Sequence, residues 1–474
     1  MSPDDAAIAA RIATTLPAAR WFAEKGAAIA GVSLADRIGP GPVGQAGAGA
    51  SIVLAAVRIA GRDEEHRYCL VVDPRGDDVA GDPAAVRWLV ETILAAARLP
   101  GTTGALAGHR LAGPPAVWPP DATVTPAGLD ASNSSFVVRA VGGGFVVKLF
   151  RRCRTGIQPE VEIGEFLAAA TGWKGSPRLL GWLEHVAADG AGSAALATVH
   201  EFVPGCTTAW DRLVGLLVAA GPQAALPADA VALAARLGTA TGRMHAALAA
   251  RPDVPAFAPE TPTAAGRRAM AARMAAHADE VFTLIESRLP DVAPPVALRL
   301  RRLLGSRTEL LGRFAPLGSL AMTTPNIRLH GDYHLGQVLV GEDDDRVLVV
   351  DFEGEPGRPV EERRMKASAA KDVAGMCRSF DYLLRHVAAT TGGRHRADDL
   401  RRLEAAFLDA YRAAAAGGAW WPADSAAAAE LLDIHRLDKA IYELAYEITN
   451  RPDWVGVPLA ALEELAATPG PSRA

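Results

Sequence analysis

The sequence predicts an α+β fold in which a β-rich first part is followed by a helical second part. Apolar and polar residues alternate over residues 51–59, as expected for a half-buried strand. The β-rich runs 136–141 and 145–150 are joined by the glycines of residues 142–144, a pattern typical of a β-hairpin. Later in the chain, alanine-rich segments such as residues 228–250 have the spacing of helices.

Length and composition indicate a globular protein of two or three domains. The chain has 474 residues, half of them apolar, which is ample for large cores. Its net charge of −5 gives no electrostatic reason to expect binding to nucleic acid or to an anionic membrane. No run of about 18 uncharged apolar residues is present, so we expect no membrane span.

The cysteines and the first residues indicate the compartment. Cys69, Cys153, Cys206 and Cys377 lie far apart without metal-ligand spacing, which favours free thiols in a reducing cytosol. The first five residues are acidic, where a signal peptide would be basic. We therefore expect a cytoplasmic protein, and we also expect it to be a monomer.

The first 110 residues are expected to form a small α+β cap. Helical spacing is found over residues 6–16 and 82–98, and strand-like alternation over residues 51–59 and 66–72. This region contains no cluster of catalytic residue types. A proline-rich passage over residues 113–120 marks the predicted boundary with the next domain.

The second predicted domain, residues 111–203, is β-rich and suited to a nucleotide. Hydroxyl groups before its hairpin could hold phosphate in place of a glycine-rich loop, and they belong to Ser132, Ser134 and Ser135. Lys148 on the second hairpin strand could pair with phosphates if a carboxylate on the next helix positions it. That helix is expected over residues 159–170. Its candidate carboxylates are Glu160, Glu162 and Glu165, and we favour Glu162 as the one that positions Lys148. Alternatively, Lys148 is an edge-strand residue whose ammonium group reaches solvent.

The third predicted domain, residues 204–474, contains the most informative stretch of the chain. Asp332 follows His330 by two residues, and Gln337 follows Asp332 by five. An apolar run then ends on Asp351, and the polar residues 341–345 between the two halves are suited to a hairpin turn.

This order of groups is the pattern of a phosphoryl-transfer site. In such sites a first carboxylate accepts the proton of the acceptor hydroxyl, and an amide and a second carboxylate hold Mg²⁺. Asp332, Gln337 and Asp351 occupy these three places. The alternative is that Asp332 is a turn residue and Asp351 a strand-end cap, but chance seldom supplies the complete ordered set. A two-lobed kinase would place its adenine-binding hinge at the end of the strand over residues 193–203, with backbone groups of Glu201 and Val203.

The chain resembles the actinobacterial maltokinase and glucosamine kinase group, which has an aminoglycoside-phosphotransferase-like and eukaryotic-kinase-like fold. The resemblance spans nearly the whole chain and is carried by RWF at 20–22, SNSS at 132–135, VKLFRR at 147–152, GI-x-P at 156–159, HGDYHLGQ at 330–337, DFEGEP at 351–356, ERR at 362–364, DVAG at 372–375 and the segment 438–454. It implies a two-lobed kinase with ATP and Mg²⁺ as cofactors and Asp332 as the catalytic base. It also implies that Lys148 contacts ATP phosphates and that Glu353 accompanies the metal ligands Gln337 and Asp351.

The acceptor is expected to be a small sugar, and glucosamine is favoured over maltose. One reason is a short cap, and the other is an acidic and aromatic set that could bind an ammonium group and a sugar face: Asp438, Tyr442, Glu443, Glu447 and Trp454. Two alternatives stay open, a maltokinase and a nucleotide-binding module without activity. Loss of the base or of a metal ligand would favour the inactive module, and none is lost.

Overall fold

The computed structural model describes residues 3–39, 49–113, 117–128, 132–190, 192–320, 324–393 and 396–467. The chain divides into two compact units. The first, β-rich unit comprises Met1–Gly205 and a returning segment, Glu355–Arg364, and the second, helical unit comprises Cys206–Gly354 and Met365–Ala474. The predicted α+β class is confirmed.

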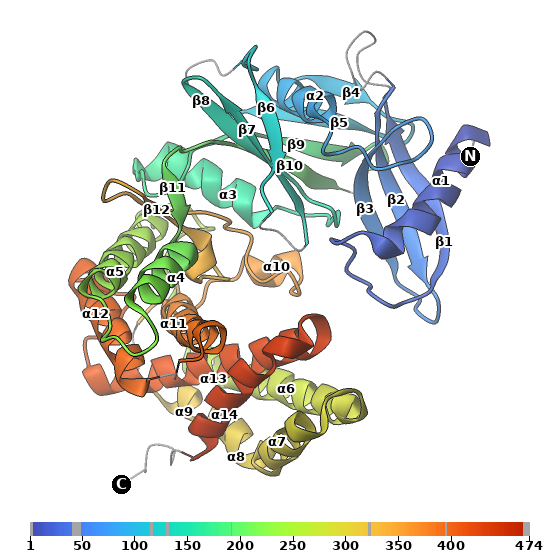
Figure 1. Ribbon diagram of the computed structural model, residues 1–474. Helices are drawn as coiled ribbons and strands as arrows, with labels where there is room; N and C mark the ends of the chain where they lie inside the picture. The colour runs from blue at the N-terminus through green and yellow to red at the C-terminus, as the bar shows by residue number, and fades with distance from the viewer. Residues whose placement is uncertain are drawn as a thin grey trace. The chain divides into compact units, whose positions relative to one another are not determined.

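The first unit contains a three-stranded antiparallel sheet. Its order is β1 (Ile29–Ile38), β2 (Ser51–Ile59) and β3 (Glu65–Val72). Helix α1 (Pro3–Thr15) and the short helix η1 (Leu16–Ala18) precede this sheet in the chain, and α1 lies beside it (Figure 1). Apolar side chains of the helix, including Ile8 and Ile12, share one buried cluster with Val53 and Val57 of the sheet.

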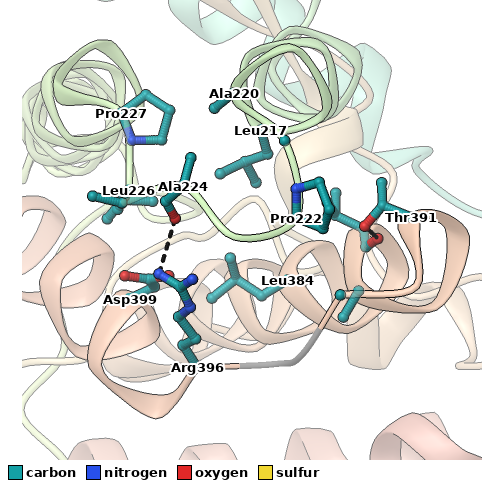
Figure 2. A pocket seen from close by; sticks show the side chains of 15 residues that line it. Leu217, Ala220, Pro222, Ala224, Leu226, Pro227, Leu384, Thr391, Arg396 and Asp399 are labelled. Atoms are coloured by element: carbon teal, nitrogen blue, oxygen red, sulfur yellow. Dashed lines mark hydrogen bonds between the residues drawn. The ribbon is translucent and has the colours of Figure 1, made fainter.

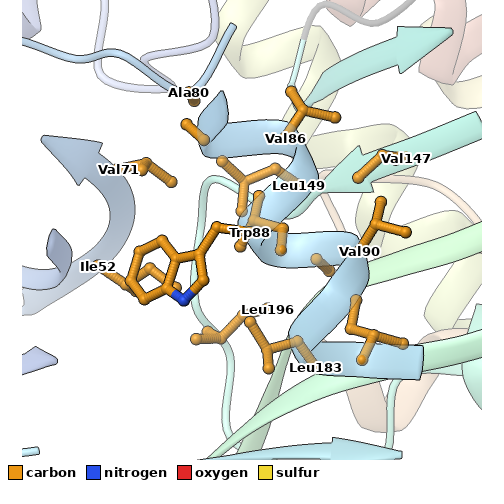
Figure 3. Close-up of a cluster of buried hydrophobic side chains, with 14 of the residues drawn as sticks. Ile52, Val71, Ala80, Val86, Trp88, Val90, Val147, Leu149, Leu183 and Leu196 are labelled. Carbon is orange, nitrogen blue, oxygen red and sulfur yellow. The ribbon is translucent and has the colours of Figure 1, made fainter. Parts of the chain in front are cut away.

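A seven-stranded antiparallel sheet forms the rest of this unit. Its order is β4 (Arg98–Pro100), β5 (Gly104–Arg110), β9 (Leu179–Ala187), β10 (Ser193–Glu201), β8 (Gly143–Leu149), β7 (Ser134–Ala140) and β6 (Thr123–Pro126). Helix α2 (Pro83–Leu94) packs against it because Val86, Trp88 and Val90 meet Leu149, Leu183 and Leu196 of the strands (Figure 3). The remaining helices of the unit are α3 (Pro159–Phe166), η2 (Leu167–Thr171) and α10 (Val360–Arg363).

Two boundaries in this unit differ from the sequence prediction. Helix α2 ends at Leu94 rather than at residue 98, because Ala96 has a φ of +50° and β4 begins at Arg98. Strands β4 and β5 belong to the larger sheet, so the predicted boundary at residue 110 falls after two strands of that sheet. Pro114 and Pro115 of the predicted boundary, and residues 129–131 before the serine run, lie outside the described residues.

The second unit is helical apart from a small antiparallel sheet. The sheet consists of β11 (Cys206–Thr208), β12 (Val338–Gly341) and β13 (Val347–Val349). Val338 pairs with Val349, which confirms the hairpin predicted around residues 341–345. The helices are α4 (Ala209–Ala220), α5 (Ala228–Leu248), α6 (Ala264–Arg288), η3 (Leu289–Asp291), α7 (Pro294–Gly305), α8 (Arg307–Gly312), α9 (Pro316–Ser319), η4 (Leu335–Gln337), α11 (Ala370–Thr391), α12 (Ala397–Ala414), α13 (Ser425–Asn450), η5 (Pro452–Trp454) and α14 (Gly456–Ala467).

Small residues allow two of these helices to approach closely. A Cβ atom on Gly238 of α5 would lie 2.1 Å from the carbonyl oxygen of Phe407 on α12, so only glycine fits there. Helices α6, α13 and α14 enclose a separate apolar core that includes Phe282, Ile441 and Leu459. Among the described residues, we find no helix with both the length and the apolar character that a bilayer crossing requires.

Candidate active site

A buried carboxylate accepts hydrogen bonds from the backbone of the loop that carries Asp332. Asp372, near the start of α11, accepts hydrogen bonds from the backbone N–H groups of His330 (2.9 Å) and Gly331 (3.0 Å). The ring of His330 lies 2.8 Å from the carbonyl oxygen of Val350, which ties the loop to the end of β13. These bonds fix the backbone on either side of the hairpin that separates the two halves of the predicted site.

The ionisation of Asp372 is set by opposing effects. Burial would raise the pKa of its carboxyl group, but the hydrogen bond from His245, the nearby imidazole rings of His245 and His330, and the N–H of Gly331 together hold the pKa below its ordinary value. His245 also contacts the hydroxyl group of Tyr411 at 2.9 Å. His245 therefore contributes to the loop's structure through its contact with Asp372.

Two glycines allow the halves of the site to meet. Gly331, immediately before Asp332, has a φ of +89°, and a Cβ atom there would lie 3.2 Å from the Cα atom of Gly354. Gly354 itself has a φ of +73°. A side chain at residue 331 would meet both backbone strain and this contact.

Asp332 forms an ion pair that the sequence did not indicate. The Nζ atom of Lys439, on α13, lies 2.8 Å from the Oδ1 atom of Asp332. Both side chains are mostly buried, with 13% of Lys439 and 20% of Asp332 exposed. Residues 107 positions apart in the chain thus form one polar contact at the predicted base.

The predicted metal ligands also lie together. The side-chain amide of Gln337 donates to the Oδ2 atom of Asp351 at 2.7 Å, and carboxylate oxygens of Asp351 and Glu353 lie within 4.8 Å of each other. Asp351 has a φ of +68°, a strained conformation for a residue with a side chain. An amide and two carboxylates supply the hard oxygen ligands that Mg²⁺ prefers, so this donor set fits the ion.

One face of α13 carries two of the five residues of the predicted acceptor set, Glu443 and Glu447. Glu443 lies one turn after Lys439, and its carboxylate accepts from Arg378 of α11 at 2.8 and 3.0 Å. Glu447 lies a further turn on and accepts from Arg451 at 2.5 Å and from the hydroxyl group of Tyr382 at 3.3 Å. Burial raises the pKa of both carboxyl groups, against the opposing effect of these arginines.

Glu447 has an oxygen atom whose hydrogen-bonding capacity is unused. Only 1% of its surface is exposed, and its Oε2 atom is buried with no hydrogen-bond partner among the residues that the structure describes. A buried carboxylate oxygen is costly to leave unpaired. Among the described residues of the second unit, no other buried carboxylate oxygen lacks a hydrogen-bond partner.

The other three residues of the predicted acceptor set surround this face. Trp454 stacks on His386 with ring centroids 5.2 Å apart, and on Tyr382 at 6.3 Å. The ring of Tyr442 lies 4.8 Å from the Lys439 ammonium group, and Asp438 is half-buried beside it in the sequence. Trp454 is thus part of an aromatic stack with side chains of α11.

In the first unit, Lys148 is a buried residue of a central strand. It lies on β8 between β7 and β10, with 5% of its surface exposed, so the alternative of an exposed edge-strand lysine does not hold. Its Nζ atom lies 3.0 Å from the Oε2 atom of Glu160, in the first turn of α3.

The prediction that Glu162 positions Lys148 is wrong. Helical residues two apart lie about 200° around the axis from each other, so Glu160 and Glu162 cannot both face the sheet. Glu162 instead holds Arg364 of the returning segment through bonds of 2.6 and 3.0 Å.

The serine run lies at the start of β7, beside Lys148. Ser135 pairs with Lys148 across the strands, and the hydroxyl group of Ser134 accepts a 2.7 Å bond from Arg151. Ser132 is half-buried in the bend before the strand. Arg151 in turn forms a 2.8 Å ion pair with Asp78.

The predicted hinge residues lie at the end of β10. The N–H of Glu201 donates to the carbonyl oxygen of Arg178 at 2.9 Å, and the N–H of Phe202 donates to Gly144 at 3.1 Å. Val203 follows them and is half-buried, two residues before the unit ends at Gly205. The backbone of this segment is therefore fixed to the sheet that contains Lys148.

A small cavity of about 50 Å³ also occurs in the second unit, between the α4–α5 loop, α11 and the start of α12. Figure 2 shows apolar side chains such as Leu217 and Leu384 in its lining together with Arg396, which donates to the carbonyl oxygen of Ala224 at 2.9 Å. None of the predicted site residues lines it. This cavity is not the site described above.

Comparison with known proteins decides the family. The model described as "Phosphotransferase enzyme family" matches residues 123–405 of the 474. The chain belongs to the phosphotransferase enzyme family. The matched range contains Lys148, Asp332 and Asp351, the residues on which the prediction of phosphoryl transfer depended.

Relatives of this phosphotransferase include two glucosamine kinases. That of Streptacidiphilus jiangxiensis is 35% identical over 71% of this chain and 72% of its own. That of Mycolicibacterium smegmatis (strain ATCC 700084 / mc(2)155) is 31% identical over 72% of this chain and 79% of its own.

Solved structures of glucosamine kinase resemble this phosphotransferase over almost its whole length. One, in complex with glucosamine, ADP and inorganic phosphate, is 28% identical with a TM-score of 0.61 and covers 96% of this chain and 98% of its own. Another, described as crystal form B, is 27% identical with a TM-score of 0.64, over 92% and 94% of the two chains.

The residues that contact predicted site residues of this phosphotransferase, and that the sequence did not indicate, include three cations. Lys439, Arg378 and Arg151 each hold a predicted site residue. Lys439 and Glu443 are four residues apart and therefore share a helical face, which was the one available signal. The pairing of Lys439 with Asp332 depends on how α13 packs and has no local signature.

Proposed function

We propose that this protein is an ATP- and Mg²⁺-dependent kinase that transfers the γ-phosphoryl group of ATP to glucosamine, giving glucosamine 6-phosphate. The proposal draws on the names of its relatives and on the solved relative that holds glucosamine, ADP and phosphate. The observation that carries the choice of acceptor is the unpaired, buried Oε2 atom of Glu447 on the same helical face as Lys439.

Asp332 acts as the base in this reaction. The acceptor hydroxyl gives its proton to the Asp332 carboxylate as its oxygen forms a bond to the γ-phosphorus, and the bond from that phosphorus to the departing ADP breaks. Asp372 keeps the base in place through the N–H groups of His330 and Gly331.

The remaining residues bind and orient the substrates. Lys148, positioned by Glu160, supplies a fixed positive charge for nucleotide phosphates. Gln337, Asp351 and Glu353 would hold Mg²⁺, which neutralises charge on the phosphate oxygens when it is bound. Ser132, Ser134 and Ser135 contribute hydroxyl donors, and Glu201 and Val203 contribute backbone groups for adenine.

The acceptor is selected by its ammonium group. A hydrogen bond between two charged groups is roughly twice as strong as a neutral one, and glucose would leave the Oε2 atom of Glu447 without a partner at a cost of about 1–3 kcal/mol. We therefore expect kcat/KM for glucosamine to exceed that for glucose by at least about tenfold.

A panel of acceptors tests this proposal. Release of ADP is measured with glucosamine, glucose and maltose at saturating ATP and Mg²⁺, and the product is identified by mass spectrometry and NMR. Preference for maltose would contradict the proposed acceptor in favour of a maltokinase, and inactivity with every sugar would contradict the proposed class.

A pair of variants tests the role of Glu447. Glu447→Gln should reduce the preference for glucosamine over glucose. Glu404→Gln is the matched control, because Glu404 pairs with Arg436 at 2.8 Å and contacts none of the proposed site residues. An unchanged preference in Glu447→Gln would assign recognition of the amine to another residue.

A further inference from the structure

We propose that Lys439 is a positioning residue for the catalytic base, holding the Asp332 carboxylate in the orientation that phosphoryl transfer requires. The inference rests on the proposed role of Asp332. It assigns to Lys439 an effect on turnover rather than on the binding of either substrate.

The geometry of the ion pair supports this role. Lys439 Nζ donates to Oδ1 of Asp332 at 2.8 Å, with both side chains largely buried. Bonds between charged groups are the stronger class of hydrogen bond, so this contact fixes the rotation of a short side chain on a loop. In the proposed arrangement the second oxygen, Oδ2, is the atom that receives the proton of the acceptor hydroxyl.

Lys439 is itself held on a rigid element. Its ammonium group lies 4.8 Å from the centre of the Tyr442 ring, in a cation–π arrangement. One turn later, Glu443 accepts two bonds from Arg378, and Arg378 also donates to Asp381 at 2.7 Å. Because these charged groups of α11 and α13 are buried together, the helix presents Lys439 to the loop at a fixed place.

The chemical step explains why position matters. As the acceptor oxygen bonds to phosphorus, its proton passes to Asp332, while Lys439 keeps its own protons and charge throughout. A displacement of about 1 Å at a reacting group can lower the rate by about 100-fold. A Lys439 that instead bound a phosphate or a sugar hydroxyl would alter KM for that substrate.

Three variants test the proposal. Lys439→Met keeps the length of the side chain and removes its charge, and we expect kcat to fall about 10- to 100-fold with both KM values changed less than about threefold. Lys439→Arg keeps the charge and should recover part of the lost turnover. The control is Lys366→Met, because Lys366 also has a largely buried side chain and binds a carboxylate, that of Glu260, elsewhere in the unit. Its kcat should stay at the wild-type value.

A double variant separates positioning from simple loss of stability. If Lys439 acts through Asp332, adding Lys439→Met to Asp332→Asn should cause no further loss of kcat. Thermal unfolding of all variants shows whether they are folded, and Lys439→Arg remains informative if Lys439→Met does not fold.

The outcomes distinguish this inference from the proposed function. Wild-type turnover in Lys439→Met, or a change confined to one KM, overturns the positioning role while Asp332→Asn remains inactive. An active Asp332→Asn would instead overturn the assignment of the base itself.

Discussion

The ammonium group of Lys148 lies 3.0 Å from the carboxylate of Glu160, joining the central strand β8 to the first turn of α3. The pair is buried, so removing one partner breaks a buried ion pair, which is destabilising. We expect Glu160→Gln to raise KM for ATP and to lower kcat, so that kcat/KM for ATP falls by at least about tenfold. The KM for the sugar should be nearly unchanged.

Glu162→Gln is the matched control for that change. It breaks the partly exposed pair with Arg364, which is worth about 1 kcal/mol or less, and leaves Lys148 in place. Steady-state kinetics of both variants, with Lys148→Ala as the reference for complete loss, test the assignment. Equal effects of the two glutamine variants on KM for ATP would contradict it.

Asp332→Asn should fold normally and lose phosphoryl transfer by orders of magnitude. Asparagine keeps the shape of the side chain but cannot accept the hydroxyl proton. Quenched-flow or coupled ADP assays measure the loss, and binding of nucleotide measured by calorimetry should be close to that of the wild type. Near wild-type turnover would remove Asp332 from the role of base.

Removal of Mg²⁺ should abolish turnover, and Asp351→Asn should have a different signature from Asp332→Asn. Gln337, Asp351 and Glu353 form the oxygen donor set, so the variant should need more Mg²⁺ for half-maximal activity. Titration of activity with Mg²⁺ after treatment with EDTA measures this. An unaltered Mg²⁺ requirement would exclude Asp351 as a ligand.

Arg151 should support nucleotide binding through Ser134. Its side chain, 4% exposed, donates to Ser134, pairs with Asp78 and lies 4.4 Å from the Trp21 ring centre. Lysine cannot make all of these contacts. We expect Arg151→Lys to raise KM for ATP about fivefold, equivalent to about 1 kcal/mol.

The adjacent arginine provides the control. Arg152 contacts His66 at 2.7 Å in the same region. Arg152→Lys should lower the melting temperature without raising KM for ATP. If both lysine variants raised KM for ATP equally, the effect would come from a general loss of packing in this region rather than from the contact with Ser134.

Asp372 should make stability depend on pH in the acid range. Its pKa is lowered in the folded protein, so its contribution to the free energy of unfolding is complete above the unfolded-state pKa of about 3.9 and is lost as the pH falls through the folded-state value. Asp372→Asn should lower stability at neutral pH by about 1–3 kcal/mol, because a buried N–H group loses its acceptor.

Urea unfolding between pH 3 and pH 7 measures both effects. The variant should show a smaller loss of stability on acidification than the wild type. Parallel curves for the two proteins would mean that other carboxyl groups determine the acid response.

Much of the site could be predicted from short-range patterns. Asp332, Gln337 and Asp351 are recognisable because the roles proposed for them require particular residue types at fixed spacings around a β-hairpin, and the structure places them around one. Lys148 was identified on the same grounds, from its place in a strand after a glycine turn. In these cases local chain geometry is sufficient to predict which residues meet.

The tertiary structure decided which charges form pairs. Glu160 and Glu162 lie in the same helical turn, and only the packing of α3 on the sheet directs Glu160 to Lys148. Lys439 reaches Asp332 because α13 packs beside α11, across 107 residues of sequence. The sequence alone determined the class of chemistry, since that depends on residue types and local spacing. The partner of each charged group depended on long-range packing, because helix orientation is fixed by the whole core rather than by neighbouring residues.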